Sequence, residues 1–236
     1  MHTIDILPPV TEAVGRRRAK EHVFDDFEPT RTALIVIDMQ NFFCAEGQSF
    51  EVPVARDIVP NINRIAAALR RAGGLVVWVR TTFTNKTAVE WSTFLNYFNT
   101  PDLRADLLAG LTADSRGHQF WPNLDIQGGD EIVDKTRFSA FIPGASEIDD
   151  RLRAKGIDTL LITGTLTNVC CESTARDASM LNYKTIMVAD GNAARNDAQH
   201  NASLSNLFVV FCDVQMTDDI VARLKKAAPS GIPAAE

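Results

Sequence analysis

The stretch LLITGTLTNVCCEST, residues 160–174, joins an apolar run to a Gly/Thr turn and then to two cysteines. Residues 159–163 are apolar and β-branched, which predicts a buried strand of a parallel sheet. From Cys170 to about Asn182 we expect a helix that begins at the cysteine. A thiol at such a helix start lies beside unpaired N–H groups and the positive end of the helix dipole, and both favour its thiolate form.

Similar apolar runs alternate with helical patterns along the rest of the chain. Residues 32–37 (TALIVI) and 75–79 (LVVWV) are continuous strand-like runs, and the segment 56–71 between them carries isoleucine and leucine at helical spacing. This alternation predicts a doubly wound, mainly parallel six-stranded sheet flanked by helices, a three-layer Rossmann-type α/β arrangement. The expected strands are 32–37, 75–79, 131–134, 159–163, 185–189 and 207–211.

We expect one domain with an arm, a cap and a tail. Residues 1–30 mix Pro, Arg, Asp and Glu without a sustained period, and they predict an N-terminal arm. Residues 31–226 are expected to form a single α/β domain. Its segment 82–128 is too long for a bare loop and contains aromatic residues, so it predicts a small helical cap over the sheet edge. Residues 227–236 are rich in Pro and Ala, which favours a flexible tail.

Composition argues against several kinds of partner. The formal net charge of −6 disfavours binding to nucleic acid or to an anionic membrane surface. No apolar run approaches the roughly 20 residues that span a bilayer, and the N-terminus lacks the apolar core of a secretory signal. The four cysteines contain no CxxC pair, and neighbouring cysteines rarely form a disulfide. We therefore expect a protein of the reducing cytoplasm.

Three reactive side chains, those of Asp38, Lys135 and Cys170, each follow a predicted strand. The carboxyl ends of parallel strands meet at one edge of a sheet, so the three can converge. Together they suffice for hydrolysis at a carbonyl: Cys170 attacks, Asp38 carries the thiol proton to the leaving group, and Lys135 supplies positive charge. Taken singly, each has an ordinary structural explanation, namely a helix cap, an exposed lysine and a buried small side chain.

Four motifs surround these residues: ALIVIDMQ (33–40), KTRFSAF (135–141), GTLTNVC (164–170) and ESTARDA (172–178). In order and spacing they resemble the isochorismatase-like cysteine hydrolases, the superfamily that contains N-carbamoylsarcosine amidohydrolase, nicotinamidase, ureidoacrylate amidohydrolase and isochorismatase. The resemblance extends from about residue 30 to about residue 225.

This resemblance has consequences for the site. It implies a catalytic triad of Asp38, Lys135 and Cys170 and a thioester intermediate. It also implies a cis peptide bond between Leu166 and Thr167 and an oxyanion hole formed by the backbone N–H groups of Thr167 and Cys170. Members of the family are commonly oligomers, so we expect a homodimer or a homotetramer.

Differences from single branches of the family narrow the chemistry. Nicotinamidases resemble one another in an Asp-x-His metal site after the second strand, but residues 80–84 here are RTTFT. We therefore expect no metal and no cofactor. Isochorismatases lack the cysteine. The string TNVCCEST (167–174) is most similar to ureidoacrylate and related amide hydrolases, although Phe138 stands where those have tyrosine. The expected reaction is cleavage of a C–N bond in a small linear amide, ureido or carbamoyl compound, with release of ammonia or an amine.

Other classes stay open at this point. Within the family, an isochorismatase-type or a nicotinamidase-type hydrolase is the alternative. Outside it, the chain is a non-catalytic binder on the same fold or a redox protein that uses Cys170 and Cys171. The substrate pocket is expected to have aromatic walls and an arginine that suits a carboxylate group. The residues predicted for it are Gln40, Phe43, Arg80, Phe83, Trp91, Phe138 and Phe141.

Overall fold

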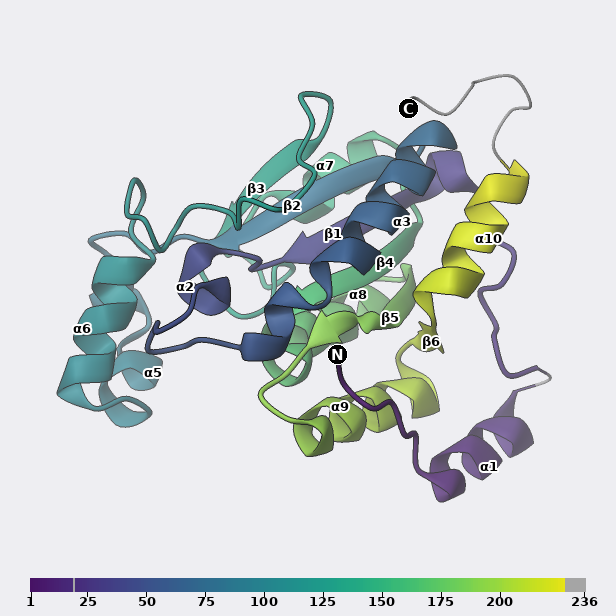
Figure 1. The fold of residues 1–236 in the computed structure, drawn as a ribbon, viewed down its shortest axis with the longest axis horizontal. Helices are drawn as coiled ribbons and strands as arrows, with labels where there is room; N and C mark the ends of the chain where they lie inside the picture. Colours follow the sequence, from purple (N-terminus) through teal and green to yellow (C-terminus); the bar gives the residue numbers. More distant parts are fainter. Residues whose placement is uncertain (19, 228–236) are drawn as a thin grey trace.

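Parallel strands form the centre of the structure, a computed structural model that describes residues 1–18 and 20–227 (Figure 1). Long apolar and β-branched runs favour such strands, because helices cover both faces of a parallel sheet. In the described residues the sheet has six strands, and every neighbouring pair is parallel. They are β1 (Thr32–Ile37), β2 (Leu75–Thr81), β3 (Glu131–Lys135), β4 (Thr159–Thr165), β5 (Lys184–Ala193) and β6 (Asp213–Gln215).

The order of the strands is β3-β2-β1-β4-β5-β6. The chain winds outward from β1 to β3 on one side and from β4 to β6 on the other, so the direction of winding reverses between β1 and β4. In open α/β sheets the crevice at such a reversal, beyond the carboxyl ends of the strands, is the usual ligand site. The predicted doubly wound, parallel six-stranded sheet is confirmed.

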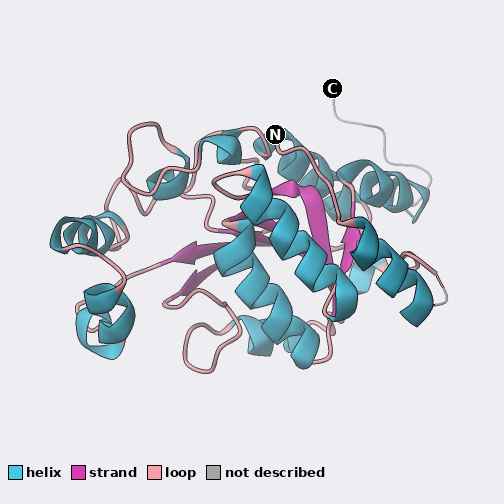
Figure 2. Ribbon diagram, turned by 90° about the horizontal axis from the view of Figure 1, so that it is seen from below, coloured by secondary structure: helices cyan, strands magenta, loops and turns pink. Residues whose placement is uncertain are grey.

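Helices cover both faces of the sheet and form the outer layers (Figure 2). Side chains alternate along β1: Leu34 and Val36 belong to one apolar core, and Ile35 and Ile37 belong to the other. The first core lies under α3 (Val59–Arg71) and α10 (Thr217–Ala227), and the second lies under α7 (Ile148–Ala154), α8 (Glu172–Met180) and α9 (Asp197–Val210).

The sixth strand differs from the prediction. Residues 207–211 (LFVVF) were expected to be a strand, but their first four residues are the end of α9, and β6 follows. A short apolar run fits a buried strand and a buried helix equally well by periodicity. The helix prevails because the Asn196 side chain caps it by accepting the Gln199 N–H, and because Leu207 is buried while Val210 is exposed, as on a one-sided helix.

Short helices form the cap near the carboxyl edge of the sheet, at the left of Figure 1. Backbone hydrogen bonds join it to the body: the Asn41 N–H donates to the Gln119 carbonyl at 2.8 Å, and the Trp121 N–H donates to the Met39 carbonyl at 2.8 Å. The segment that follows β1 is therefore fixed to the cap. The cap helices are α4 (Thr87–Glu90), α5 (Ser92–Tyr97) and α6 (Pro101–Gly110), and the shorter turns of the body are α2 (Asn41–Cys44), η1 (Pro29–Arg31) and η2 (Pro53–Arg56).

The N-terminal segment lies along α9. Its helix α1 (Pro8–Arg17) packs against α9, and the ring of His2 stacks on the ring of His200 with centroids 4.3 Å apart. The tail expected at 227–236 lies outside the described residues except for Ala227, the last residue of α10. Among the described residues, every helix is too short or too polar to cross a membrane.

Candidate active site

Asp38 is the first residue beyond β1, and the tight packing of β4 sets its position. Its backbone has φ 53°, in the left-handed region that aspartate tolerates better than most residues, and its N–H donates to the Val79 carbonyl at 2.8 Å. Gly164 of β4 pairs with Ile37, has φ 117°, and leaves no room for a Cβ beside the Ile37 carbonyl. Only glycine lets the two strand ends approach so closely.

Lys135, the last residue of β3, is completely buried, and its ammonium group donates three hydrogen bonds. The acceptors are Asp38 Oδ2 at 2.8 Å, Thr81 Oγ1 at 2.7 Å and the Arg137 carbonyl at 3.0 Å. The Thr81 hydroxyl in turn donates to Asp38 Oδ1 at 3.0 Å. Both oxygens of the carboxylate are therefore held, as a buried charge requires.

Charge, rather than burial, decides the protonation of Lys135. Burial by itself lowers the pKa of the ammonium group, but the neighbouring Asp38 carboxylate and the Cys170 sulfur raise it by more. The resulting pKa lies above the ordinary value of 10.5, so Lys135 carries its charge at neutral pH.

Cys170 lies in a π-helical turn, η3 (Thr167–Cys171), that directly precedes α8. The α-helix therefore begins two residues after the predicted start, and the cysteine lies in the π-helical turn before it. Burial raises the pKa of the Cys170 thiol above its ordinary value; Lys135 opposes this rise and Asp38 adds to it. The predicted bias toward thiolate is wrong for the resting site, because desolvation outweighs the lysine charge. Asp38 and Lys135 both lie close enough to the thiol to act on its pKa.

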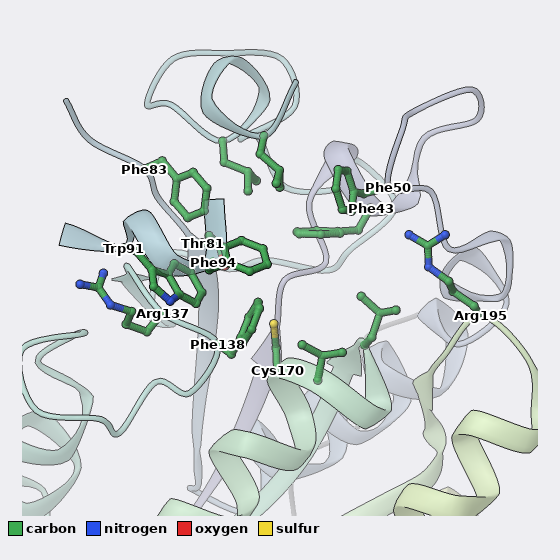
Figure 3. A pocket seen from close by; sticks show the side chains of 14 residues that line it. Phe43, Phe50, Thr81, Phe83, Trp91, Phe94, Arg137, Phe138, Cys170 and Arg195 are labelled. Carbon is green, nitrogen blue, oxygen red and sulfur yellow. The ribbon is translucent and has the colours of Figure 1, made fainter. Parts of the chain in front are cut away.

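A cavity of about 200 Å³ opens above the sulfur of Cys170 (Figure 3). Four residues predicted for the substrate pocket line it: Phe43, Phe83, Trp91 and Phe138. The ring of Phe138 lies next to the sulfur of Cys170, and Arg137 and Arg195 lie on opposite sides of the cavity (Figure 3). The further lining residues are Phe50, Thr81, Phe94, Leu107, Leu111, Leu166 and Val169.

Three residues predicted for the pocket lie elsewhere. Arg80 precedes Thr81 in β2, and neighbouring strand residues face opposite sides, so Arg80 points away and pairs with Asp134 at 2.5 Å. The amide of Gln40 bonds to backbone: it accepts the Thr81 N–H at 2.8 Å and donates to the carbonyls of Thr81 and His118, both at 3.0 Å. Phe141 packs in the sheet core, against Tyr183.

The cis peptide bond joins Thr165 and Leu166, one bond before the predicted Leu166–Thr167. Strand β4 continues through Thr165, two residues beyond its expected end, and the chain leaves the sheet there. Thr167 is completely buried, and its hydroxyl oxygen lies 2.8 Å from Nδ1 of His200 on α9. Its side chain therefore faces away from the cavity, whereas Leu166 lines it.

Sequence reasoning missed Thr81 and the two arginines of the cavity. Thr81 is the last residue of β2 and lies at the same edge of the sheet as the reactive residues. The strand was expected to end at Val79, so Arg80 was chosen as the first residue beyond it instead of Thr81. Arg137 follows Lys135 within a quoted motif, but nothing local in the sequence indicates that Arg195 reaches the same cavity. Among the described residues, no group of three or more His, Cys, Asp or Glu side chains could hold a metal ion.

A comparison with known protein families agrees with the fold. A family model described as the isochorismatase domain matches residues 32–219. The chain belongs to the isochorismatase family. It is 33% identical over 219 residues to a ureidoacrylate amidohydrolase RutB of Klebsiella pneumoniae, covering 86% of this chain and 91% of the relative. A RutB of Rhizobium rhizogenes is also 33% identical, over 86% of this chain and 87% of the relative.

Solved structures have a similar fold. A cysteine hydrolase from Pseudomonas syringae pv. phaseolicola superposes with a TM-score of 0.75 at 30% identity, covering 89% of this chain and 100% of that chain. An N-carbamoylsarcosine amidase from Thermoplasma acidophilum superposes with a TM-score of 0.63 at 26% identity, covering 80% and 97%. The resemblance drawn from the sequence motifs is confirmed.

Proposed function

We propose that this protein is an amidohydrolase that cleaves the C–N bond of a small amide, ureido or carbamoyl compound through a thioester on Cys170. One observation carries the proposal: Lys135 binds the Asp38 carboxylate, and the Cys170 thiol meets both of them at the floor of a cavity. The similarity to ureidoacrylate amidohydrolases and to an N-carbamoylsarcosine amidase supports the same class of reaction.

The first half of the reaction forms the thioester. Because burial keeps the Cys170 thiol protonated, the thiol must lose its proton as it attacks, and Asp38 is the base beside it. Lys135 stays charged and holds the carboxylate in place through its hydrogen bond to Oδ2. The sulfur adds to the carbonyl carbon, the C–N bond breaks, and Asp38 returns the proton to the departing ammonia or amine.

Backbone N–H groups near Cys170 hold the oxyanion in this scheme. The N–H groups of Leu166 and Thr167 have no acceptor among the described residues, so both are available to a negative oxygen. Thr167 with Cys170 is the pair expected from the sequence. Leu166 is the second candidate for the partner of Cys170, since it lines the cavity and Thr167 does not.

The second half of the reaction consumes water. Asp38 takes a proton from a water molecule, the hydroxide adds to the thioester carbonyl, and the sulfur leaves with that proton to regenerate the thiol. The products are a carboxylic or carbamic acid and the amine. Arg195, an exposed residue at the side of the cavity, is free to bind a carboxylate substituent of the substrate, because no ion pair engages it in the part of the chain that the structure describes.

Two further properties belong to this proposal. All four cysteines are free and buried, which supports a reducing compartment, and we place the protein in the cytoplasm. We also propose a homodimer or homotetramer, without nucleic acid or membrane as a partner. Light scattering after size-exclusion chromatography measures the mass directly, and a monomer of 26.0 kDa would contradict the oligomer.

The deciding experiment measures ammonia release from a panel of small amides, ureido acids and carbamoyl amino acids. We expect at least one of them to be hydrolysed, and Cys170→Ala should lower kcat by at least about 10⁴-fold. Mass spectrometry of the acid-quenched enzyme should detect the acyl group on the peptide that contains Cys170.

Cys171→Ala is the matched control, because the sulfur of Cys171 faces the Thr163 carbonyl in the core instead of the cavity. This variant should keep its turnover per folded molecule. EDTA should not change the rate; activity that is lost to EDTA and restored by zinc would favour the nicotinamidase alternative instead. Near-normal turnover of Cys170→Ala would overturn the thioester scheme.

A further inference from the structure

The wall of the cavity is far less polar than its floor, by which we mean the side chains of Asp38, Thr81, Lys135 and Cys170. Ten of the fourteen lining side chains are apolar, and six of these ten are aromatic. Four of the rings pack on one another: the centroid of Trp91 is 4.5 Å from that of Phe94 and 4.7 Å from that of Phe138, Phe94 and Phe138 are 5.0 Å apart, and Phe83 meets Trp91 edge-on at 6.2 Å. Rings packed in this way form a preorganised surface rather than a collapsible one.

The polar groups of the cavity are mostly engaged already. The Thr81 hydroxyl accepts from Lys135 and donates to Asp38. The Arg137 guanidinium donates to the carbonyls of Thr136 at 2.9 Å and Glu90 at 3.3 Å, and it lies over the ring of Trp91. A polar substituent pushed against this wall would therefore lose its hydrogen bonds to water and find few replacements, which disfavours its binding.

The size of the cavity suits a compact group. An apolar cavity of about 150 Å³ lined by Leu, Ile and Phe binds benzene. The volume of about 200 Å³ here leaves room for a branched alkyl group or one ring together with the amide that reaches Cys170. A long or bulky apolar chain would not fit beside that amide.

We propose that the substrate carries a compact apolar substituent, of a size between isobutyl and phenyl, which packs against the aromatic wall of Phe83, Trp91, Phe94 and Phe138 while the amide or carbamoyl carbonyl meets Cys170. This inference rests on the proposed hydrolysis and adds the substrate class to it. The aromatic wall then determines specificity, and the triad below it performs the reaction.

Matched substrates test the proposal on the unmodified enzyme. N-carbamoyl-leucine and N-carbamoyl-asparagine have side chains of the same shape and both carry a carboxylate; release of the free amino acid, rather than of ammonia, is measured because the asparagine side chain is itself an amide. 3-Methylbutanamide and 3-hydroxybutanamide form the corresponding pair without a carboxylate and with one amide each. We expect kcat/KM to favour the apolar member by roughly 10- to 100-fold in whichever pair is hydrolysed, the range for burying one such group.

A variant of the wall tests the location. Phe94→Gln places an amide among the rings, and we expect it to lower the preference for the apolar member about tenfold. Phe98→Ala is the control, because Phe98 is the same residue type in the same cap but is 76% exposed and does not line the cavity. It should leave both preferences unchanged.

The outcomes separate this inference from the proposed function. Equal or better hydrolysis of the polar members, or a preference that Phe94→Gln leaves intact, would overturn the aromatic wall as the specificity surface and leave the thioester reaction standing. Absence of hydrolysis across all four compounds and the wider panel would overturn the proposed function itself.

Discussion

The floor and the wall of the cavity are built on opposite physical principles. The floor consists of the buried side chains of Asp38, Thr81, Lys135 and Cys170, and hydrogen bonds join the first three to one another. The wall consists of aromatic rings, most of them from the cap and the loops, that hold one another by packing. Reaction and selection are thus carried by different elements, and changes to one should leave the other measurable.

The largest effect should follow from breaking the floor with Lys135→Met. The change leaves the Asp38 carboxylate buried without its cation, which costs about 3–5 kcal/mol in the free energy of unfolding. It should also abolish turnover of apolar and polar substrates alike, whereas Phe94→Gln should change the ratio of their kcat/KM values. Urea titration together with kcat for both substrates checks this, and a stable Lys135→Met enzyme with normal kcat would refute the role of the lysine.

A second change, Gly164→Ala, tests the close approach of β4 to β1 that positions Asp38. An alanine there would adopt an unfavourable φ and press its Cβ against the Ile37 carbonyl, for a loss of about 2–5 kcal/mol. Gly128→Ala is the control: a Cβ at Gly128 meets nothing within 4 Å, and the loss should stay below about 0.5 kcal/mol. Equal stability of the two variants would mean that the approach of β4 to β1 does not require glycine.

Alkaline pH should deprotonate groups of the floor and leave the wall unchanged, because the aromatic rings of the wall have no group that loses a proton at alkaline pH. Lys135 and Cys170 both have pKa values raised by the fold, so the folded state keeps their protons longer than the unfolded chain does. Their contribution to stability is complete below the unfolded pKa of the thiol, 9.0, and is lost as pH rises toward the folded values. The buried thiols of Cys44 and Cys212 act in the same direction.

Urea unfolding at a series of pH values measures this loss. The free energy of unfolding should fall steadily above about pH 9. Cys170→Ala should show a shallower fall, because it removes one of the titrating thiols. A stability that stays flat to about pH 11 would contradict the raised pKa values.

The smallest effect is expected for Arg80→Ala, which touches neither region. The ion pair with Asp134 is partly exposed, and such pairs contribute less than about 1 kcal/mol. Turnover of every substrate should stay within about twofold of the unmodified enzyme. A large loss of kcat/KM for carboxylate-bearing substrates alone would return Arg80 to the binding site and displace Arg195 from that role.

The floor was largely predictable because parallel strands carry a simple rule. Asp38, Lys135 and Cys170 each follow an apolar run, and such ends converge at one edge of the sheet. The rule predicts the edge of the sheet but not the direction in which each side chain points. Strand β2 continues to Thr81, two residues beyond its expected end, so Arg80 and Thr81 are strand residues whose side chains point to opposite faces of the sheet. Arg80 was therefore placed in the pocket, and Thr81 was overlooked.

The wall was less predictable, because cap residues converge only through tertiary packing. Aromatic residues in a segment without strong periodicity indicate a core, and Phe83 and Trp91 were chosen on that basis. Nothing local distinguishes Phe94, which lines the cavity, from Phe98, which is exposed on the same cap. Burial likewise reverses the expected ionisation of Cys170, since desolvation depends on surroundings that a single motif does not contain.

The fully bonded amide of Gln40 has a consequence for the timing of the reaction. Since that one side chain ties the end of β2 to the loop that carries His118, swinging the cap open would expose and break several buried polar contacts at once. We therefore expect the cap to stay closed during turnover and substrates to enter past side chains at the mouth, whose rotations take nanoseconds rather than milliseconds. The measured rate should then report bond making and breaking at the sulfur.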